Sequence, residues 1–304
     1  VHVPLEDLAQ LGPAVRSTRQ VRHGRHRSTT EEVPHELVRA LPRRATGAVG
    51  DRHERGLQRL QLFEGLRQLR NPYTLAFTLA MPFAMYLLFG ASMDYASQSA
   101  GHGNVAFYVM VSMAAYGTET ASSSLCSLAA SEVGQGWGRQ LALTPLSTAG
   151  YALTKVLSAM SFAALSVLIV YIAGYVTGAA AEDVWRWFAS AAITLVLGLV
   201  YGLFGLGVGL AFNSDSAAAL ASISITFFGF FGNVFVPLSG VMLDIAKWTP
   251  MYGYAALVRW PATGGALVAG GSDPLWAVVL NVVVWGALFA LLVRFGGLRS
   301  LRRR

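Results

Sequence analysis

The stretch Thr194–Phe212, TLVLGLVYGLFGLGVGLAF, contains no charged residue. Its length is close to the ~20 residues that a helix needs to cross the apolar part of a bilayer. Glycines recur in it at helical spacing, which lets a neighbouring helix approach closely; the alternative is the general abundance of glycine in membrane helices. The stretch predicts a membrane-spanning helix, and its glycines are Gly198, Gly202, Gly205 and Gly209.

The rest of the chain repeats this character. Only 13% of the 304 residues are charged, whereas a soluble domain usually carries about 25%. Apolar runs of spanning length predict an all-α polytopic membrane protein with six transmembrane helices. The predicted spans are 73–92, 105–129, 152–178, 187–212, 217–239 and 274–295.

Basic residues are distributed unevenly between the loops that join these spans. From Arg59 onward, 10 lysines and arginines fall on one side and 3 on the other, the latter being Arg186, Lys247 and Arg259. Because lysine and arginine collect on the cytoplasmic side, both termini and the polar loop Ala130–Lys155 are predicted to be cytoplasmic. We therefore expect a multi-pass protein of a bacterial-type cell membrane. The lipid bilayer also accounts for the net charge of +7 better than nucleic acid does, since no recognition motif accompanies the basic residues.

The first 70 residues differ from the spans. Residues 1–50 are rich in arginine and histidine and show no lasting helical period, so a disordered tail, or a start of the gene that lies further along, is favoured over a folded regulatory extension. We expect residues 51–304 to form the transmembrane domain. Its first part, 51–70, has the pattern of an amphipathic helix that lies in the membrane interface, the alternative being a helix packed on a soluble partner. The residues assigned to the interfacial helix include Arg59, Phe63, Arg67 and Arg70.

Two features interrupt the apolar pattern. Glu119 lies near the middle of the span 105–129, where an acid is costly and usually faces a cavity or a partner. It is a candidate cavity-lining group; the alternative, slightly favoured, is a neutral or hydrogen-bonded carboxyl that helps helices pack. The second feature follows the fifth span, where Pro237, Pro250 and Tyr252 lie in a stretch too polar to span and too apolar for a free loop. We expect helices there that dip into the outer interface, or else an ordered loop.

Catalytic motifs are missing from the sequence. It holds no G-x-x-x-x-G-K-[ST], so ATP is not bound through a P-loop, and no H-E-x-x-H or G-x-S-x-G. Cys126 is the single cysteine, and neither it nor His102, which is alone in a predicted external loop, has metal-ligand spacing to other residues. The chain is therefore expected to be no enzyme and to hold no metal or cofactor of its own.

Three stretches together resemble the membrane permease subunit of type-2 ABC exporters, over about residues 57–304. The first is the basic helix that ends LRNP at Leu69–Pro72, and the third is GNVFVPLSGVMLDIAKWTPMYGYAALVRW at 232–260. The second is the loop ASEVGQGWGRQLALTPLSTAGYALTK at Ala130–Lys155, which is similar to the family's ATPase-coupling segment. The resemblance assigns coupling roles in this loop to Glu132, Gly136, Arg139, Leu141, Thr144 and Pro145.

This resemblance implies partners. A second permease subunit, identical or related, and two separate ABC ATPase subunits would complete the transporter, and the ATPases would bind ATP and magnesium. The family commonly exports drugs, antibiotics, lipids or other amphiphiles. Two alternatives stay open at the level of the sequence: a membrane sensor or scaffold that does not transport, and a proton-coupled secondary transporter that uses Glu119.

Overall fold

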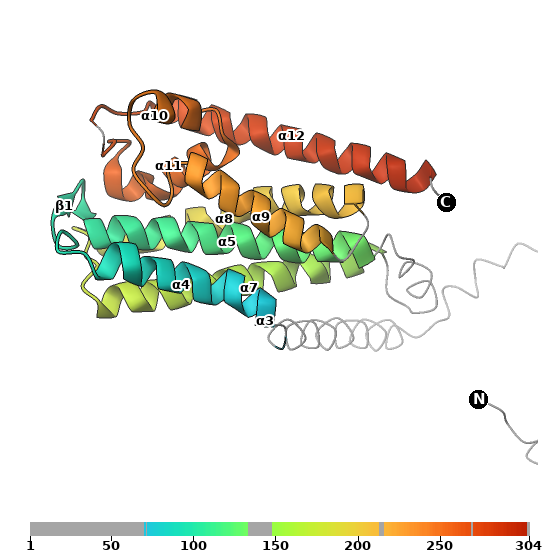
Figure 1. Ribbon diagram of the computed structural model, residues 1–304, viewed down its shortest axis with the longest axis horizontal. Helices are drawn as coiled ribbons and strands as arrows, with labels where there is room; N and C mark the ends of the chain where they lie inside the picture. Colours follow the sequence, from blue (N-terminus) through green and yellow to red (C-terminus); the bar gives the residue numbers. More distant parts are fainter. Residues whose placement is uncertain (1–69, 71, 133–147, 213–215, 269, 303–304) are drawn as a thin grey trace, which may run out of the picture. The chain divides into compact units, whose positions relative to one another are not determined.

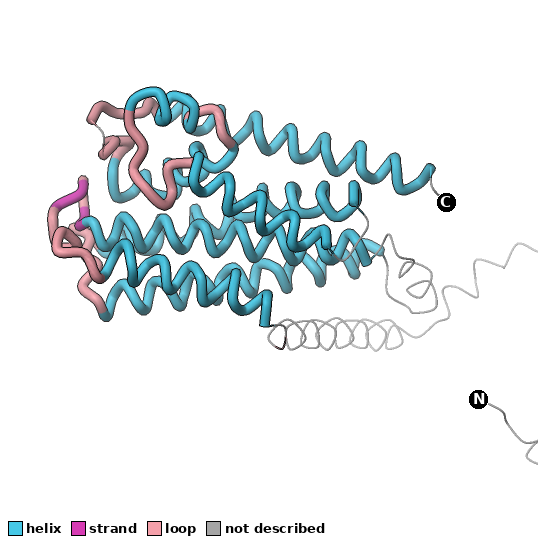
Figure 2. Tube along the Cα trace, viewed as in Figure 1, coloured by secondary structure: helices cyan, strands magenta, loops and turns pink. Residues whose placement is uncertain are grey.

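The structure is a computed structural model that describes residues 70, 72–132, 148–212, 216–268 and 270–302. All of them belong to one structural unit that begins at Val49. Within it, helices pack side by side as a bundle, and the only strands described form a short hairpin (Figures 1 and 2). The start of α3 and the end of α12 lie at one end of this bundle, the α3 end. The hairpin, α10 and α11 lie at the other, the hairpin end (Figure 1).

The first predicted span is a helix that alternates between α and π turns. It comprises α3 (Pro72–Leu75), η3 (Ala76–Ala80), α4 (Met81–Tyr86) and η4 (Leu87–Ala91). Pro82 lies at the start of α4, where its missing N–H and its ring would disturb an ordinary α turn. A preceding π turn, with Met81 N–H bonded to the Ala76 carbonyl, accommodates it.

A short β-hairpin with a two-residue turn precedes the central helix. Strands β1 (Ser99–Ala100) and β2 (Gly103–Asn104) pair antiparallel, and α5 (Val105–Glu132) follows. Helix α5 is buried along most of its length by α4, α7, α8, α9 and α11. Many of its hydroxyls return hydrogen bonds to carbonyls one turn back, as Ser112 does to Tyr108 and Thr120 to Tyr116. These bonds let a helix rich in serine and threonine lie in an apolar core.

The outer helices are α7 (Thr148–Val176), α8 (Val184–Phe212), α9 (Ser216–Phe231) and α12 (Leu275–Arg302). Within the described residues, three segments are long and apolar enough to cross a membrane: Thr154–Val176, Val184–Phe212 and Leu275–Gly296. They confirm the membrane character of the third, fourth and sixth predicted spans.

The other predicted spans differ in detail. Helix α5 is not among the three apolar segments, because its neighbours bury it and it need not be apolar all round. The fifth span was expected to reach residue 239, but α9 ends at Phe231. There Asn233 adopts a left-handed φ of 60°, which turns the chain.

The stretch after this turn is helical, as expected from its mixed polarity. Helix α10 covers Gly240–Ala246 and α11 covers Pro250–Thr263. Pro250 lies at the start of α11, a position that needs no N–H donor, and Gly264 ends that helix in the left-handed conformation. Figure 2 shows both helices beside the loops of the hairpin end.

Candidate functional site

Most of the predicted coupling residues lie outside the described residues. This holds for Gly136, Arg139, Leu141, Thr144 and Pro145, and likewise for Arg59, Phe63 and Arg67 of the interfacial helix. The described part of the chain includes Arg70, which is exposed just before α3, and Glu132, the last residue of α5.

Glu132 forms an ion pair at the base of the predicted coupling loop. Lys155 Nζ, from the second turn of α7, donates to Glu132 Oε2 at 2.7 Å. Both side chains are buried, with 9% of the lysine and 10% of the glutamate exposed. The pair therefore links the two helices that the segment 133–147 joins. The structure thus brings the predicted coupling residue Glu132 into contact with Lys155, which lies at the start of the third predicted span.

Behind this ion pair, α5 and α8 are in backbone contact. A Cβ at Gly205 would collide with the Ser123 backbone, and one at Gly209 would collide with the Ser127 backbone. A Cβ at Gly198 would meet the Thr118 side chain. The glycines of α8 thus form a packing seam against α5. Of the two explanations for these glycines, close helix packing is therefore correct, and general glycine abundance is not needed.

An apolar cavity of about 280 Å³ lies between α5, α7 and α8. Its lining includes Cys126 from α5, Val156 and Met160 from α7, and Leu203 from α8. Val156 directly follows Lys155 in the sequence. The cavity shows that α7 and α8 are not tightly packed against one another next to the ion pair.

Glu119 is completely buried at the centre of α5. Tyr201 of α8 and Tyr254 of α11 are close enough to interact with it electrostatically, and their rings meet edge to face at 5.3 Å. Neither carboxyl oxygen of Glu119 nor the Tyr201 hydroxyl makes a hydrogen bond of standard geometry within the described residues. The neighbouring Thr120 hydroxyl bonds the Tyr116 carbonyl instead. Glu119 therefore lies at a helix-packing junction; the role of a cavity-lining group stays a prediction.

Arg259 is a buried cation that the sequence pattern counted only as an external charge. It is 4% exposed, and its guanidinium donates to the Tyr108 hydroxyl at 2.7 Å and to the carbonyls of Asn233 at 2.9 Å and Ala255 at 3.0 Å. It also lies 4.8 Å from the centre of the Tyr108 ring. Asn233 in turn accepts the Leu238 N–H with its side chain. These bonds fasten α5, the turn after α9 and α11 to one another.

The predicted outer-segment residues have distinct environments. Pro237 is exposed in the loop before α10, whereas Pro250 and Tyr252 are buried. Tyr252 donates a hydrogen bond to the Asp273 carboxylate, which also pairs with Lys247 at 3.4 Å. Burial, followed by the bond to Asp273, raises the pKa of the Tyr252 phenol, so this residue remains a donor.

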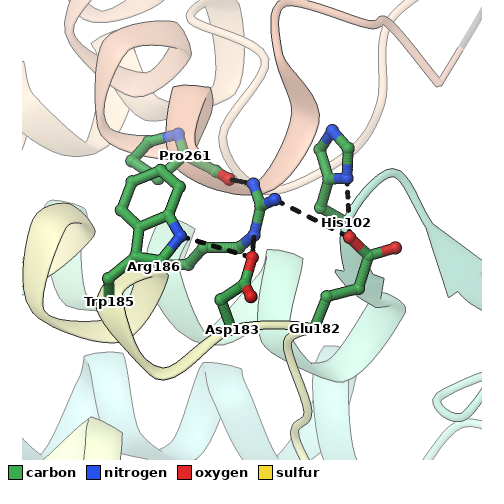
Figure 3. A network of polar contacts seen from close by, with 6 residues as sticks. All are labelled: His102, Glu182, Asp183, Trp185, Arg186 and Pro261. Atoms are coloured by element: carbon green, nitrogen blue, oxygen red, sulfur yellow. Dashed lines mark hydrogen bonds and ion pairs between the residues drawn. The ribbon is translucent and has the colours of Figure 1, made fainter.

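A second polar network joins three segments at the hairpin end (Figure 3). His102, expected to be alone, has its Nδ1 2.8 Å from Glu182 Oε2, so that expectation was wrong. Arg186 pairs with Glu182 at 3.7 Å and with Asp183 at 3.0 Å, and it donates to the Pro261 carbonyl at 2.5 Å. The network connects the β1–β2 turn, the start of α8 and the end of α11, a set of contacts that no motif in the sequence signals.

The described residues thus form a bundle of apolar helices with a buried ion pair at the base of one inter-helix segment and a hydrogen-bonded network at the opposite end. The sequence pattern of the family described as "ABC-2 type transporter" matches residues 57–264. The chain belongs to this family and is the membrane permease subunit of an ABC exporter.

A relative agrees with this assignment. The chain is 27% identical over 247 residues to a protein of Bacillus subtilis (strain 168) described as "Putative transport permease YvfS". The similarity covers 79% of this chain and 96% of the relative. The resemblance to the permease family that the sequence motifs indicate is therefore confirmed.

Proposed function

We propose that this permease subunit crosses the membrane six times, with the α3 end in the cytoplasm, and is driven by a separate ATPase subunit. The start of α3 and the end of α12 lie at the same end of the bundle, as an even number of crossings requires (Figure 1). The excess of basic residues in the loops of that end supports its cytoplasmic location.

The observation that carries the proposal is the family match, combined with the missing P-loop in the sequence. A subunit of an ABC exporter that has no nucleotide-binding motif needs a partner that hydrolyses ATP. The segment 133–147 is the proposed contact for this ATPase, with Gly136 and Arg139 in it. Its base is the buried Glu132–Lys155 pair, which is suited to passing a movement to α5 and α7.

We further propose that two permease subunits, identical or related, enclose the translocation path and that the substrate is an amphiphile such as a drug, antibiotic or lipid. The surface cavities of the described helices are mainly apolar. One of about 580 Å³ between α7 and α8 is lined by Tyr171, Tyr175 and Trp187 among alanines and other apolar side chains. Apolar walls with aromatic groups favour a ligand that is largely hydrophobic.

Reconstitution tests this proposal. The chain is co-expressed with a candidate ABC ATPase subunit, purified through a tag on the permease and placed in liposomes with a fluorescent amphiphile. We expect the ATPase to co-purify and export to require ATP and to stop with vanadate. Export that ignores ATP but stops with a protonophore would favour a secondary transporter, and a stable complex without export of any amphiphile tested would favour a sensor or scaffold.

A further inference from the structure

The buried ion pair between Glu132 and Lys155 places one of its charges against the electrostatics of its own helix. Glu132 ends α5, where the helix dipole favours cations, so its carboxylate does not suit this position unless an opposite charge is nearby. Each charge is also nearly buried, which is costly for an ion that lacks a partner. The two residues therefore stabilise each other, and neither suits its position without an opposite charge nearby.

Near the pair, α8 is in close contact with α5 but is separated from α7 by a cavity. At Gly205 and Gly209, the backbones of α5 and α8 approach so closely that no side chain fits between them. Helix α7 is separated from α8 by the cavity that Val156 and Met160 line from the α7 side. A displacement of α7 relative to α8 would thus meet little resistance from packing at that cavity, whereas Ala159, Phe162 and Ala163 of α7 are buried against α5. Val156, which lines the cavity, directly follows Lys155.

We propose that Glu132 and Lys155 form a charge clamp, which holds the start of α7 against α5 so that both helices flanking residues 133–147 move together. They are positioning residues: the clamp passes on a movement that the loop receives. This role rests on the proposed function, in which an ATPase moves the loop. The existence of the clamp rests only on the contacts of the described residues.

Cys126 offers an internal reporter for the clamp. It is the single cysteine of the chain, it is 3% exposed, and it lines the cavity between α5, α7 and α8. We expect its alkylation by N-ethylmaleimide in native membranes to be slow in the unaltered protein. Glu132→Gln or Lys155→Gln should raise the rate at least about tenfold, equivalent to about 1.4 kcal/mol in the opening equilibrium.

The charge-swapped variant, with Glu132→Lys and Lys155→Glu together, separates a clamp from a merely buried pair. It restores opposite charges at the same two positions, and it places the cation at the end of α5, where the helix dipole favours it. We expect its alkylation rate to return to that of the unaltered protein. Glu182→Gln, which alters an exposed pair with His102 at the hairpin end, is the matched control and should leave the rate unchanged.

Export measured per ATP hydrolysed, in the complex with the ATPase, then tests the role in coupling. The single variants should hydrolyse ATP but export several-fold less per ATP, and the swap should recover the ratio. Unchanged alkylation and coupling in both single variants, or a swap that recovers neither, would overturn the clamp. If no ATPase binds the unaltered protein, the proposed function fails, while the alkylation series still decides whether the clamp exists.

Discussion

Glu119 and Arg259 are both ionisable side chains buried in this bundle, but their surroundings differ. Arg259 donates to three acceptors from α5, α11 and the turn after α9. The Tyr201 hydroxyl is a polar neighbour of the Glu119 carboxyl, but within the described residues neither carboxyl oxygen makes a hydrogen bond of standard geometry. Arg259 therefore contributes to stability through bonds that a substitution removes. Glu119 occupies space at a helix junction where a neutral group of the same shape would fit equally well.

Replacing Arg259 by glutamine should loosen the cap at the hairpin end. The variant loses the bonds to Tyr108 and to the Asn233 carbonyl, and bonds to charged groups each contribute about 1.5–3 kcal/mol. Tyr108→Phe, which removes one of these bonds, should cost about 1.5–3 kcal/mol, less than Arg259→Gln. Thermal unfolding in detergent, followed by a maleimide dye that reacts with Cys126 as it becomes exposed, measures both losses.

The control for this series is Tyr95→Phe, since Tyr95 is 46% exposed and belongs to no network described above. Its unfolding temperature should match that of the unaltered protein. An Arg259→Gln variant that unfolds at the same temperature would contradict the role of this arginine as a pin.

Glu119→Gln should be tolerated. The carboxamide matches the carboxyl in shape and carries no charge, so the junction of α5, α8 and α11 keeps its packing, and stability should change by less than about 1 kcal/mol. Glu119→Lys places a longer cation in the same site and should prevent accumulation of folded protein. Export assays in the ATPase complex add a separate reading: loss of export by Glu119→Gln with the ATPase still bound would give the carboxyl a role in transport.

At the scale of elements, the contact between α5 and α8 organises the bundle. Helix α8 supplies glycines and α5 supplies serines and threonines. Some of these hydroxyls bond within α5, and Ser123 donates to the Tyr201 carbonyl of α8 at 3.2 Å. On its opposite side, α5 meets α4 and α7 through Gly117, where a Cβ would collide with Ser166 and press on Pro82. Small residues thus let three helices approach one central helix.

Gly205→Ala should destabilise the bundle by about 1–3 kcal/mol, because the added methyl collides with the backbone of Ser123 and one helix must shift. Gly202→Ala is the matched control one turn away. Its added methyl would lie 3.4 Å from the flexible end of Cys126, so we expect little change. Unfolding temperatures in detergent, monitored by the loss of helical circular dichroism, compare the two variants. Equal temperatures would refute the assignment of the seam to Gly205.

At the scale of the whole molecule, the bundle separates two kinds of structure. The hairpin end carries the pinned turn at Asn233, the helices α10 and α11 and the network around Arg186 (Figures 1 and 3). At the α3 end, the clamp between α5 and α7 lies beside a cavity. Among the described residues, the hydrogen bonds and ion pairs at the hairpin end join several segments, and the clamp at the α3 end joins the two helices that flank residues 133–147. This arrangement fits a bundle that is moved from the α3 end.

Changes in the proposed coupling loop should uncouple the whole transporter without unfolding it. Arg139→Glu reverses a charge that we assign to the ATPase contact, and Gly136→Pro restricts the backbone beside it. We expect both variants to insert into the membrane at normal levels and to lose export. Membrane fractionation and vesicle export assays measure the two properties, and normal export in both variants would remove the basis for assigning the loop to the ATPase.

The sequence alone determined the membrane class, the order of most helices and the family. Those conclusions rest on hydropathy, charge asymmetry and short motifs, which are local properties that survive without knowledge of the fold. The helices after Pro237 were expected for the same reason, since their mixed polarity fits neither a span nor a free loop.

Only the tertiary structure decided which polar groups meet. Glu132 and Lys155 are separated in sequence by 23 positions and Arg259 and Tyr108 by 151, and no helical period relates the members of either pair. The choice between a glycine seam and mere glycine abundance in α8 also needed the position of α5. Pairing of buried charges and close approach of backbones depend on which helices become neighbours, and that follows from packing of the whole bundle rather than from any local pattern.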